Sequence, residues 1–546
     1  MKKKSKLLSA SFGMLALVAL AAFAAVAPAA SAGEAVLPAS EARIKDTGAR
    51  IENDGWNLWG NGALGDWFNI EKRGRIFLTI KAAGQPAANV FPRVRVLAED
   101  AGGAQVFSKQ FTVDSREYKD YRFEFDAEQV TLRIEVEFLN DFAGAGEDRN
   151  LLIREIRVSG AKRVTEAPKV EVHTEEAVRR HRMGTLTVLT KPGATVKVTQ
   201  LRHEFQFGTA ISWFMFSESA PESDRNRYME VLKANFNAAV HENELKWHNT
   251  EPVAKGVYTW ERADRMLDWC EKNGMTMRGH CIFWASENRV PAWVKELDDA
   301  ELQKTVERRA REVTARYRGR IHEYDLNNEM LFYNYYRDRL GEGITADMAR
   351  CAKEGDPDAV LYMNQWGIIE GDGTAKYVEQ IRGLLDRKIP IGGIGCQGHF
   401  GKRMDIQKVQ RDLDTLAQFK LPIKITELDI DTPDEQRKAE ELEAFFRVCF
   451  GHPAVEGIYM WGFWEGRHWR PRAALWKKDW TPTPAAEVYR RLVYDEWWTR
   501  FEGKADASGQ CELRAFYGTH LVETGGKEKR VALKKEDGTA TVNLDH

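Results

Sequence analysis

The chain has 546 residues and a formal net charge of −2. Its length predicts about two to four folded units rather than one. The near-neutral charge excludes a globally basic protein of the kind that binds nucleic acid through its overall field.

The first 32 residues have the pattern of an export signal. Lysines dominate the first six residues, an apolar run extends from Met14 to Val26, and Ala30-Ser31-Ala32 forms a small-residue cleavage site. The apolar run is too short to favour a membrane span, although a retained N-terminal anchor is the alternative. We therefore expect a mature protein that begins near Gly33, is secreted or periplasmic, and has no membrane association after cleavage.

Residues 33–160 are predicted to form a β-sandwich module. Short runs that alternate apolar and polar residues are separated by glycine-rich turns, and Thr131–Phe138 alternates almost throughout. Residues 161–202 begin with a charged stretch that indicates a linker or a short helix. They continue with a pair of strands that turns at Pro192-Gly193, so this range is expected to lead into the next domain.

From residue 203 to residue 500, short apolar strands alternate with amphipathic helical stretches. The strand candidates are Phe205–Ser212, Phe236–Glu242, Met277–Trp284, Ile321–Asn328, Ala359–Asn364, Gly392–Gly398, Ile423–Leu428 and Gly457–Phe463. Eight β/α units in about 300 residues predict an α/β fold, a closed (β/α)8 TIM barrel rather than an open sheet. Residues 501–546 return to β character and are expected to be a small C-terminal appendage that packs on the barrel.

The 6 cysteines show no paired spacing and no dense framework. Cys281 and Cys396 lie inside apolar strand-like runs. Buried free thiols are therefore the favoured interpretation, and a single disulfide is the alternative.

Two carboxylates stand at the ends of predicted strands, where barrel enzymes keep their active sites. Glu329 follows the fourth strand and Glu427 ends the seventh. Glycosidic cleavage requires such a pair, because one group protonates the leaving oxygen while the other attacks the anomeric carbon or activates water. A separation of about 5–5.5 Å would indicate retention through a covalent intermediate. Structural ion pairing is the alternative role for both residues.

Five motifs at these strand ends occur in the order found in a known family. They are Glu242-Asn243-x-x-Lys246-Trp247, Gly279-His280-x-x-x-Trp284, Asn328-Glu329, Gln397-x-His399 and Thr426-Glu427-Leu428-Asp429. With them, residues 203–500 resemble family 10 glycoside hydrolases, the xylanase family, and are closest to the branch that includes plant enzymes. The resemblance implies endo-hydrolysis of β-1,4-xylosidic bonds in xylan by a monomer, through a covalent glycosyl-enzyme intermediate and without a catalytic cofactor.

The resemblance also implies a role for each matching residue. Glu329 is the acid/base and Glu427 is the nucleophile. The implied substrate-binding residues are Glu242, Asn243 and Lys246 in the glycone subsites, His280 and Trp284 next to the point of cleavage, Asn328 on the substrate 2-hydroxyl, Gln397 and His399 beside the nucleophile, and Trp461 and Trp469 stacked on sugar rings. Ordinary packing is the alternative for His399 and Trp469. Asp429 is either a support for the site or a turn residue, and Glu244 is expected to be structural.

Two segments depart from the pattern of many bacterial members. Ala285-Ser286-Glu287 follows the third strand, and Trp464–Trp469 follows the eighth. Both lie near the glycone wall, so substituted xylans or a related β-1,4-glycan remain possible substrates.

The end of the N-terminal module resembles carbohydrate-binding module families 36 and 60. The similarity lies in Phe138–Asp141, Asp148–Leu151 and Ile156–Gly160. Those modules bind xylan through calcium, and an acidic loop with amide oxygens suits a hard cation. Asp141 and Asp148 are the candidate calcium ligands, and a plain acidic turn without metal is the alternative. Trp56, Trp59 and Trp67 are either a stacking face or core.

Other functions use the same features. A transglycosylase would form the same covalent intermediate, so the sequence does not distinguish it from a hydrolase. A non-catalytic carbohydrate-binding protein is disfavoured, because Glu329 and Glu427 are both present. A metal-dependent hydrolase is disfavoured, because no His/Asp cluster at ligand spacing lies on the strand ends.

Overall fold

The computed structural model describes residues 33–544 except for 46, 101–104, 145 and 166–174. The chain divides into two compact units, Met1–Pro168 and Lys169–His546. The predicted export signal lies outside the described residues. In the described part of the chain, no helix is both long enough and apolar enough to cross a membrane.

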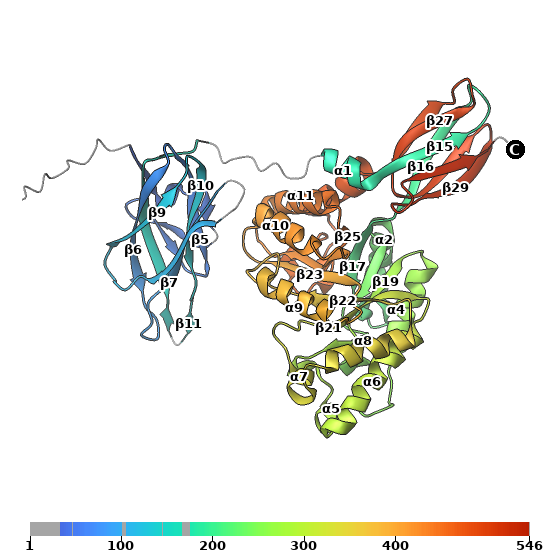
Figure 1. Ribbon diagram of the computed structural model, residues 1–546, viewed down its shortest axis with the longest axis horizontal. Coiled ribbons are helices and arrows are strands. Elements are labelled where there is room, and N and C mark those ends of the chain that lie inside the picture. The colour runs from blue at the N-terminus through green and yellow to red at the C-terminus, as the bar shows by residue number, and fades with distance from the viewer. Residues whose placement is uncertain (1–32, 46, 101–104, 145, 166–174, 545–546) are drawn as a thin grey trace, which may run out of the picture. The chain divides into compact units, whose positions relative to one another are not determined.

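The N-terminal unit contains two antiparallel sheets packed face to face and a short pair of strands, β11 (Ala143–Gly144) and β12 (Glu147–Asp148) (Figure 1). One contains β1 (Glu34–Pro38), β3 (Ala49–Ile51), β4 (Gly55–Leu58), β13 (Asn150–Ser159), β6 (Gly74–Gln85) and β9 (Lys119–Ala127). The other contains β2 (Ile44–Lys45), β14 (Ala161–Arg163), β5 (Gly62–Ile70), β10 (Thr131–Phe138), β7 (Arg93–Asp100) and β8 (Gln105–Thr112). Alternate residues such as Leu132, Ile134 and Val136 face a shared core, as the period of a strand requires. The module extends through β14, three residues beyond the boundary expected at 160.

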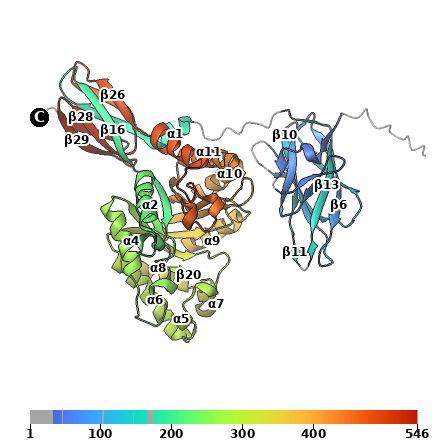
Figure 2. The ribbon, with the colours of Figure 1, turned by 180° about the vertical axis from the view of Figure 1, so that it is seen from behind.

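The second unit contains a closed parallel barrel, which confirms the predicted fold (Figure 2). Its strands are β17 (Gln206–Ile211), β18 (Ala238–His241), β19 (Thr276–Gly279), β20 (Phe283–Trp284), β21 (Ile321–Asn328), β22 (Val360–Gln365), β23 (Gly393–Phe400), β24 (Ile423–Ile430) and β25 (Val455–Met460). β19 and β20 both pair with β21 and together act as the third strand, and β25 closes the ring on β17. Every residue of β24 is buried, as expected for a strand covered on both faces.

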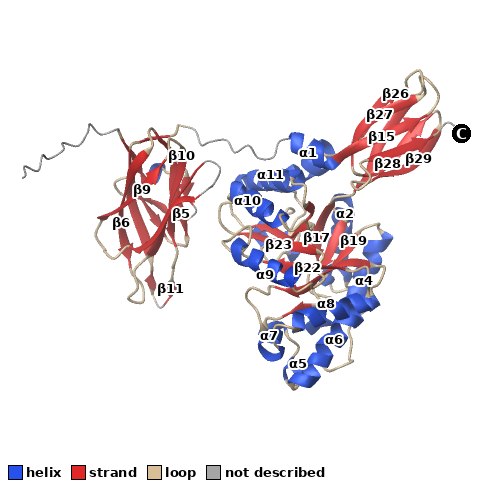
Figure 3. Cartoon of the chain, in the orientation of Figure 1, coloured by secondary structure: helices blue, strands red, loops and turns tan. Residues whose placement is uncertain are grey.

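Helices surround the barrel strands (Figure 3). They are α2 (Glu222–Asn235), α3 (Trp247–Thr250), α4 (Glu261–Lys272), α5 (Ala292–Lys295), α6 (Asp299–Arg316), α7 (Tyr335–Leu340), α8 (Ile344–Gly355), α9 (Thr374–Asp386), α10 (Ile406–Ala417), α11 (Glu435–Gly451) and α12 (Pro484–Arg490). Several begin where the sequence supplies a capping side chain. Asp298, Asp405 and Asp434 each accept a hydrogen bond from a backbone N–H in the first turn of α6, α10 and α11. Such caps satisfy backbone donors that a helix leaves unpaired.

Tyrosine rings help to fill the barrel interior. Gly208 lies against the ring of Tyr459 and Gly393 against the ring of Tyr362, and a Cβ atom at either glycine would overlap the ring. Both tyrosines are buried. The glycines therefore make room for large side chains from neighbouring strands, so the barrel is a packed core and not a pore.

A second β-sandwich joins chain segments that are far apart in sequence. β15 (Met183–Leu189) pairs with β27 (Gln510–Phe516) and β30 (Thr539–Asn543). β16 (Thr195–His203) pairs with β26 (Arg500–Lys504) and β28 (Gly518–Thr524), which in turn pairs with β29 (Lys527–Leu533). The two sheets enclose their own core, which includes Leu186, Val198 and Val522. The tail is thus not only an appendage on the barrel, because it completes a sandwich with the strands that precede the barrel.

The sandwich is attached to the barrel by a buried arginine. Arg182, at the end of α1 (Glu175–Arg182), donates hydrogen bonds to the backbone carbonyls of Phe450, His452 and Val455. Its guanidinium also lies 4.7 Å from the ring centroid of Phe205. All six cysteines are buried and free, as the sequence favoured.

Candidate active site

A cleft of about 600 Å³ opens at the C-terminal ends of the barrel strands. Every catalytic and substrate-binding residue proposed from the sequence lines this one cleft: Glu242, Asn243, Lys246, His280, Trp284, Asn328, Glu329, Gln397, His399, Glu427, Trp461 and Trp469. The cleft is also lined by residues that the sequence analysis did not single out, namely Arg289, Trp366, Gly367, Glu370, Gly371 and Arg470. These groups come together because the carboxyl ends of parallel strands meet at one edge of a barrel.

Glu427, on β24, is a buried carboxylate held by hydrogen-bond donors on both oxygens. Asn364 Nδ2 donates to its Oε1 at 2.8 Å, and His399 Nε2 lies 3.2 Å from its Oε2. Burial alone would raise the pKa of Glu427, but the hydrogen bond and charge of His399, with the nearby His280 and Lys246, bring it below its usual range. Glu427 is therefore held ionised, the state that a nucleophile needs.

His399 is kept protonated by two carboxylates. Its Nδ1 donates to Asp429 Oδ2 at 2.8 Å, and its Nε2 faces Glu427. Burial lowers the pKa of His399, but Asp429 and Glu427 together raise it to about 10. Asp429 also accepts hydrogen bonds from Trp469 Nε1 at 2.8 Å and Arg470 Nη1 at 3.0 Å. Asp429, which the sequence left as either a support or a turn residue, is placed as a support of this network.

The pKa of Glu329 is shifted upward, in the opposite direction to that of Glu427. Trp284 Nε1 donates to its Oε2 and Gln397 Nε2 to its Oε1, both at 3.0 Å. Burial raises the pKa of Glu329, and the negative charge of Glu427 raises it further against the effect of Gln397. The two carboxyl groups thus have pKa values shifted in opposite directions, the arrangement that separates an acid from a nucleophile. The Gln397 side chain hydrogen-bonds to Glu329, while its backbone pairs with that of Glu427 between β23 and β24.

The backbone of Glu329 is strained. Its φ angle is +62°, in the left-handed region that side chains with a Cβ atom rarely adopt. Such a residue costs on the order of 1–3 kcal/mol and persists only where its surroundings fix it. Here the N–H of Glu329 donates to the carbonyl of Asn364, and its own carbonyl accepts from Phe332 and Tyr333. This backbone conformation directs the carboxyl group of Glu329, the residue directly after β21, into the cleft.

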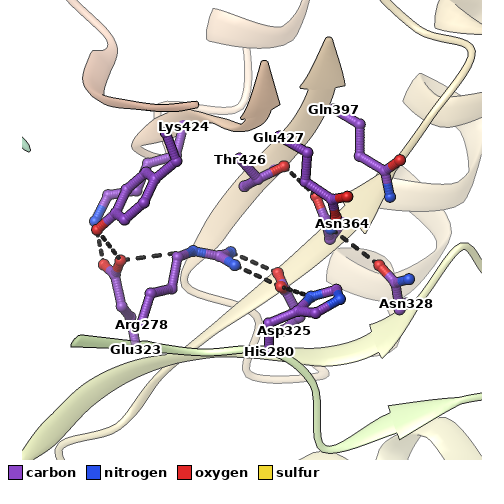
Figure 4. Close-up of polar contacts among 12 residues, drawn as sticks. Arg278, His280, Glu323, Asp325, Asn328, Asn364, Gln397, Lys424, Thr426 and Glu427 are labelled. Atoms are coloured by element: carbon purple, nitrogen blue, oxygen red, sulfur yellow. Dashed lines mark hydrogen bonds and ion pairs between the residues drawn. The ribbon is translucent and has the colours of Figure 1, made fainter. Parts of the chain in front are cut away.

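Asn364, at the end of β22, connects the two halves of the site and was missed by the sequence analysis (Figure 4). Its Nδ2 donates to Asn328 Oδ1 at 2.9 Å as well as to Glu427, and its Oδ1 accepts from Thr426. With its oxygen engaged, the Asn328 side chain presents its Nδ2 group, which makes no hydrogen bond to the described residues. The signal for Asn364 was its position, a polar residue at the C-terminal end of a predicted barrel strand.

A buried ion-pair network lies beneath His280 (Figure 4). His280 Nδ1 donates to Asp325 Oδ2 at 2.8 Å, and Asp325 forms a double salt bridge with Arg278. Both Arg278 and Asp325 are almost fully buried. This network fixes the tautomer of His280, so that its Nε2 atom faces away from Asp325.

The wall formed by β18 and β25 supplies donors and aromatic surface. Lys246 Nζ donates to Asn243 Oδ1 at 3.0 Å and lies 5.0 Å from the Trp284 ring centroid. Burial raises the pKa of Glu242.

Two tryptophans of the cleft differ in exposure. Trp461 is buried edge-on against His280, whereas Trp469 remains 51% exposed. The Arg470 guanidinium lies 4.4 Å from the Trp469 ring centroid, and the exposed part of the ring is surface that ordinary packing does not explain. Glu244 accepts a hydrogen bond from the N–H of Asn243, in keeping with the structural role expected for it.

The N-terminal module has oxygen atoms suited to a hard cation. Asp141 Oδ1 and Asn150 Oδ1 are buried and have no hydrogen-bond partner. Asn150 also donates to Asp148 Oδ2 at 2.9 Å, which ties it to the second candidate ligand. Among the described residues, no group of three or more His, Cys, Asp or Glu side chains is placed to hold a metal. A calcium ion here would therefore use amide or main-chain oxygens besides carboxylates, which fits its preferences.

Comparison with known proteins identifies both modules. Residues 198–491 match the model of glycosyl hydrolase family 10, and residues 77–173 match that of the Ca-dependent, xylan-binding carbohydrate-binding module family 60. The chain is 40% identical over 359 residues to anti-sigma-I factor RsgI6 of Acetivibrio thermocellus (65% of this chain, 46% of the relative). It is 36% identical over 362 residues to endo-1,4-beta-xylanase 1 of Arabidopsis thaliana (65% and 37%). The chain thus spans less than half the length of these relatives.

A solved structure shares the barrel. Native xylanase 10B of Thermotoga maritima superimposes with a TM-score of 0.50 at 26% identity, covering 54% of this chain and 96% of that one. The family model spans every residue of the cleft. The resemblances seen in the sequence are confirmed, and the chain belongs to glycosyl hydrolase family 10.

Proposed function

We propose that this protein is a secreted, retaining endo-β-1,4-xylanase in which Glu329 is the acid/base and Glu427 the nucleophile. The observation that supports it most is the opposite shift of the two carboxyl pKa values within one cleft. Membership of a glycoside hydrolase family and the names of its xylanase relatives favour xylan as the substrate. The export signal at residues 1–32 supports a secreted or periplasmic location.

The opposite pKa shifts of the two carboxyl groups suit a two-step displacement. In the first step the ionised Glu427 attacks the anomeric carbon, while the protonated Glu329 gives its proton to the departing glycosidic oxygen. Esterification removes the charge of Glu427, so its contribution to the raised pKa of Glu329 disappears. Glu329, now ionised, can then take a proton from the water that attacks the glycosyl ester. The same residue thus serves as acid and then as base.

The surrounding residues hold the substrate during these steps. Asn328 Nδ2, which has no hydrogen-bond partner among the described residues, is positioned to donate to the sugar hydroxyl beside Glu427. Lys246, Asn243 and Glu242 offer donors and acceptors to the glycone sugars, and Trp469 offers a ring face. We propose further that the N-terminal module binds xylan, with Asp141 and Asp148 among its calcium ligands. The ion would supply coordination positions for sugar hydroxyls, and the module match supports this role.

Reducing-sugar release from soluble xylan tests the proposal. We expect the wild type to be active and Glu427→Ala to lose about three orders of magnitude or more in kcat, because the covalent route is removed. Glu440→Ala, at an exposed site on α11, is the matched control and should retain full activity. Detection of the first-formed anomer by NMR tests retention.

An inert wild type on xylan would remove the substrate assignment, and full activity of Glu427→Ala would remove the nucleophile assignment. Assays of the same wild-type protein also distinguish two alternative functions. Products longer than the substrate at high acceptor concentration would indicate a transglycosylase. Binding to xylan without any bond cleavage would indicate a carbohydrate-binding protein.

A further inference from the structure

Arg289 is a cation of the cleft that the proposed mechanism does not use. It belongs to the short turn Glu287–Arg289 after β20, and its side chain is exposed at the cleft wall. Its guanidinium lies 5.0 Å from the ring centroid of Trp284, the residue that donates to Glu329. The position is thus next to the acid/base but outside its hydrogen-bond network.

The other basic side chains of the cleft are occupied. His280 contacts Asp325, His399 contacts Asp429 and Glu427, Arg470 contacts Asp429, and Lys246 bonds to the Asn243 amide. Arg289, in contrast, makes no side-chain hydrogen bond or ion pair with the described residues. The guanidinium lies over the Trp284 ring, a contact that uses none of its N–H donors.

The turn that presents Arg289 is held firmly. The N–H of Arg289 donates to the carbonyl of Ser286 at 2.8 Å. Burial lowers the pKa of His248 to about 4, so its ring is neutral, and its Nδ1 donates to the carbonyl of Arg289 at 3.1 Å. The next residue, Val290, is buried in the barrel core. An exposed side chain on a fixed backbone is a suitable recognition group, because less order has to be created on binding.

The charge of the cleft indicates the ligand. The cleft is lined by four glutamates, Glu242, Glu329, Glu370 and Glu427. An acidic polysaccharide that enters the cleft therefore meets several carboxyl groups, and it needs a cation such as Arg289 to bind its own negative charge. A guanidinium with free N–H donors in a fork matches a carboxylate better than it matches a single hydroxyl. We propose that Arg289 binds the carboxylate of a uronic acid branch on the substrate chain, at the side of the cleft formed by Trp284. This inference rests on the proposed xylanase function and adds the substrate class that the enzyme prefers.

The test compares two substrates that differ only in the charge of the branch. One is native glucuronoxylan, and the other is the same polymer with its carboxyl groups reduced to alcohols. We expect the wild type to cleave the native polymer with the higher kcat/KM, by about fivefold, as an exposed ion pair allows. The difference should shrink in about 0.5 M salt, because salt screens exposed charges. Arg289→Gln should cleave both polymers alike, at the rate of the wild type on the reduced one.

Arg227→Gln is the matched control. Arg227 is exposed on α2 and pairs with Glu230 at 3.0 Å, so its loss changes net charge equally without touching the cleft. It should keep the preference for the native polymer. The inference is overturned if Arg289→Gln loses activity equally on both polymers, which would mean recognition of a neutral hydroxyl, or if it keeps the wild-type preference. An enzyme inert on both polymers would instead overturn the proposed function, and this inference with it.

Discussion

The chemistry of the cleft depends on a charge arrangement in which Asp429 acts through His399 on Glu427. Asp429 accepts from His399, Trp469 and Arg470, and it does not itself contact the nucleophile in the described contacts. It keeps the imidazole protonated, and the protonated imidazole keeps Glu427 ionised. Asp429 is therefore a positioning residue whose effect should appear in the pH dependence.

Replacing Asp429 by Asn should shift the acid limb of the kcat/KM profile to higher pH. Without the carboxylate, the pKa of His399 falls from about 10, the ring loses its charge near neutral pH, and the pKa of Glu427 rises. We expect the limb to move by about one pH unit, the size typical of a lost charge partner. Asp431→Asn is the control, since Asp431 pairs with Arg472 outside this network. An unchanged limb with reduced activity would assign Asp429 a purely structural role.

At the residue scale, the sequence predicted the side chains that line the cleft but not those that connect them. Glu329, Glu427 and His399 stand in motifs at strand ends, where position and chemistry coincide. Asn364 carries no charge and lies in a segment without a recognised motif. Its role is visible only in the structure, where the pairing of β22 with β21 and β23 brings Asn364 beside the residues it connects. The pairing of Arg278 with Asp325 likewise joins two strands that are 47 residues apart in the chain.

At the scale of elements, Arg182 fastens the second β-sandwich to the barrel. Arg182→Leu would remove the guanidinium donors from the buried carbonyls of Phe450, His452 and Val455, of which the His452 carbonyl still accepts from the N–H of Val455. An unpaired buried polar group costs about 1–3 kcal/mol, so we expect about 2 kcal/mol or more of destabilisation, read as a lower midpoint in thermal or denaturant unfolding. Arg180→Leu on the same helix removes only an exposed pair with Glu176 and should cost less than about 1 kcal/mol. Equal effects of the two changes would contradict the fastening role.

The barrel strands were predicted to within a few residues, whereas the second sandwich was not foreseen as a unit. A buried parallel strand is an apolar run of limited length bounded by helices, which is a local signal. The pairing of β15 with β27 instead joins residues more than 300 positions apart, and nothing in either segment specifies the other. The sequence therefore predicts the segments of β15 and β27 as two separate β regions.

At the scale of the whole molecule, the two units have separate hydrophobic cores. We expect the fragment Lys169–His546 to cleave soluble xylan as fast as the full chain but to lose activity on insoluble xylan, where a binding module raises the local concentration. A chelator should reproduce this loss in the full chain and have no effect on the fragment, because the oxygen ligands belong to the module. Equal sensitivity of fragment and full chain to the chelator would place the calcium requirement in the barrel unit.

The strands that enter the barrel and the strands that leave it share one sandwich, and this sets an order of events during synthesis. When β15 and β16 emerge from the ribosome, their partners β26–β28 and β30 lie some 300 residues away and have not yet been made. Until those strands have been made, both β15 and β16 expose unpaired edges, which are templates for aggregation. The second sandwich can consequently form only after residues 500–543 have been synthesised, and a chain that stops between β26 and β30 would keep these edges exposed rather than be a slightly shorter enzyme.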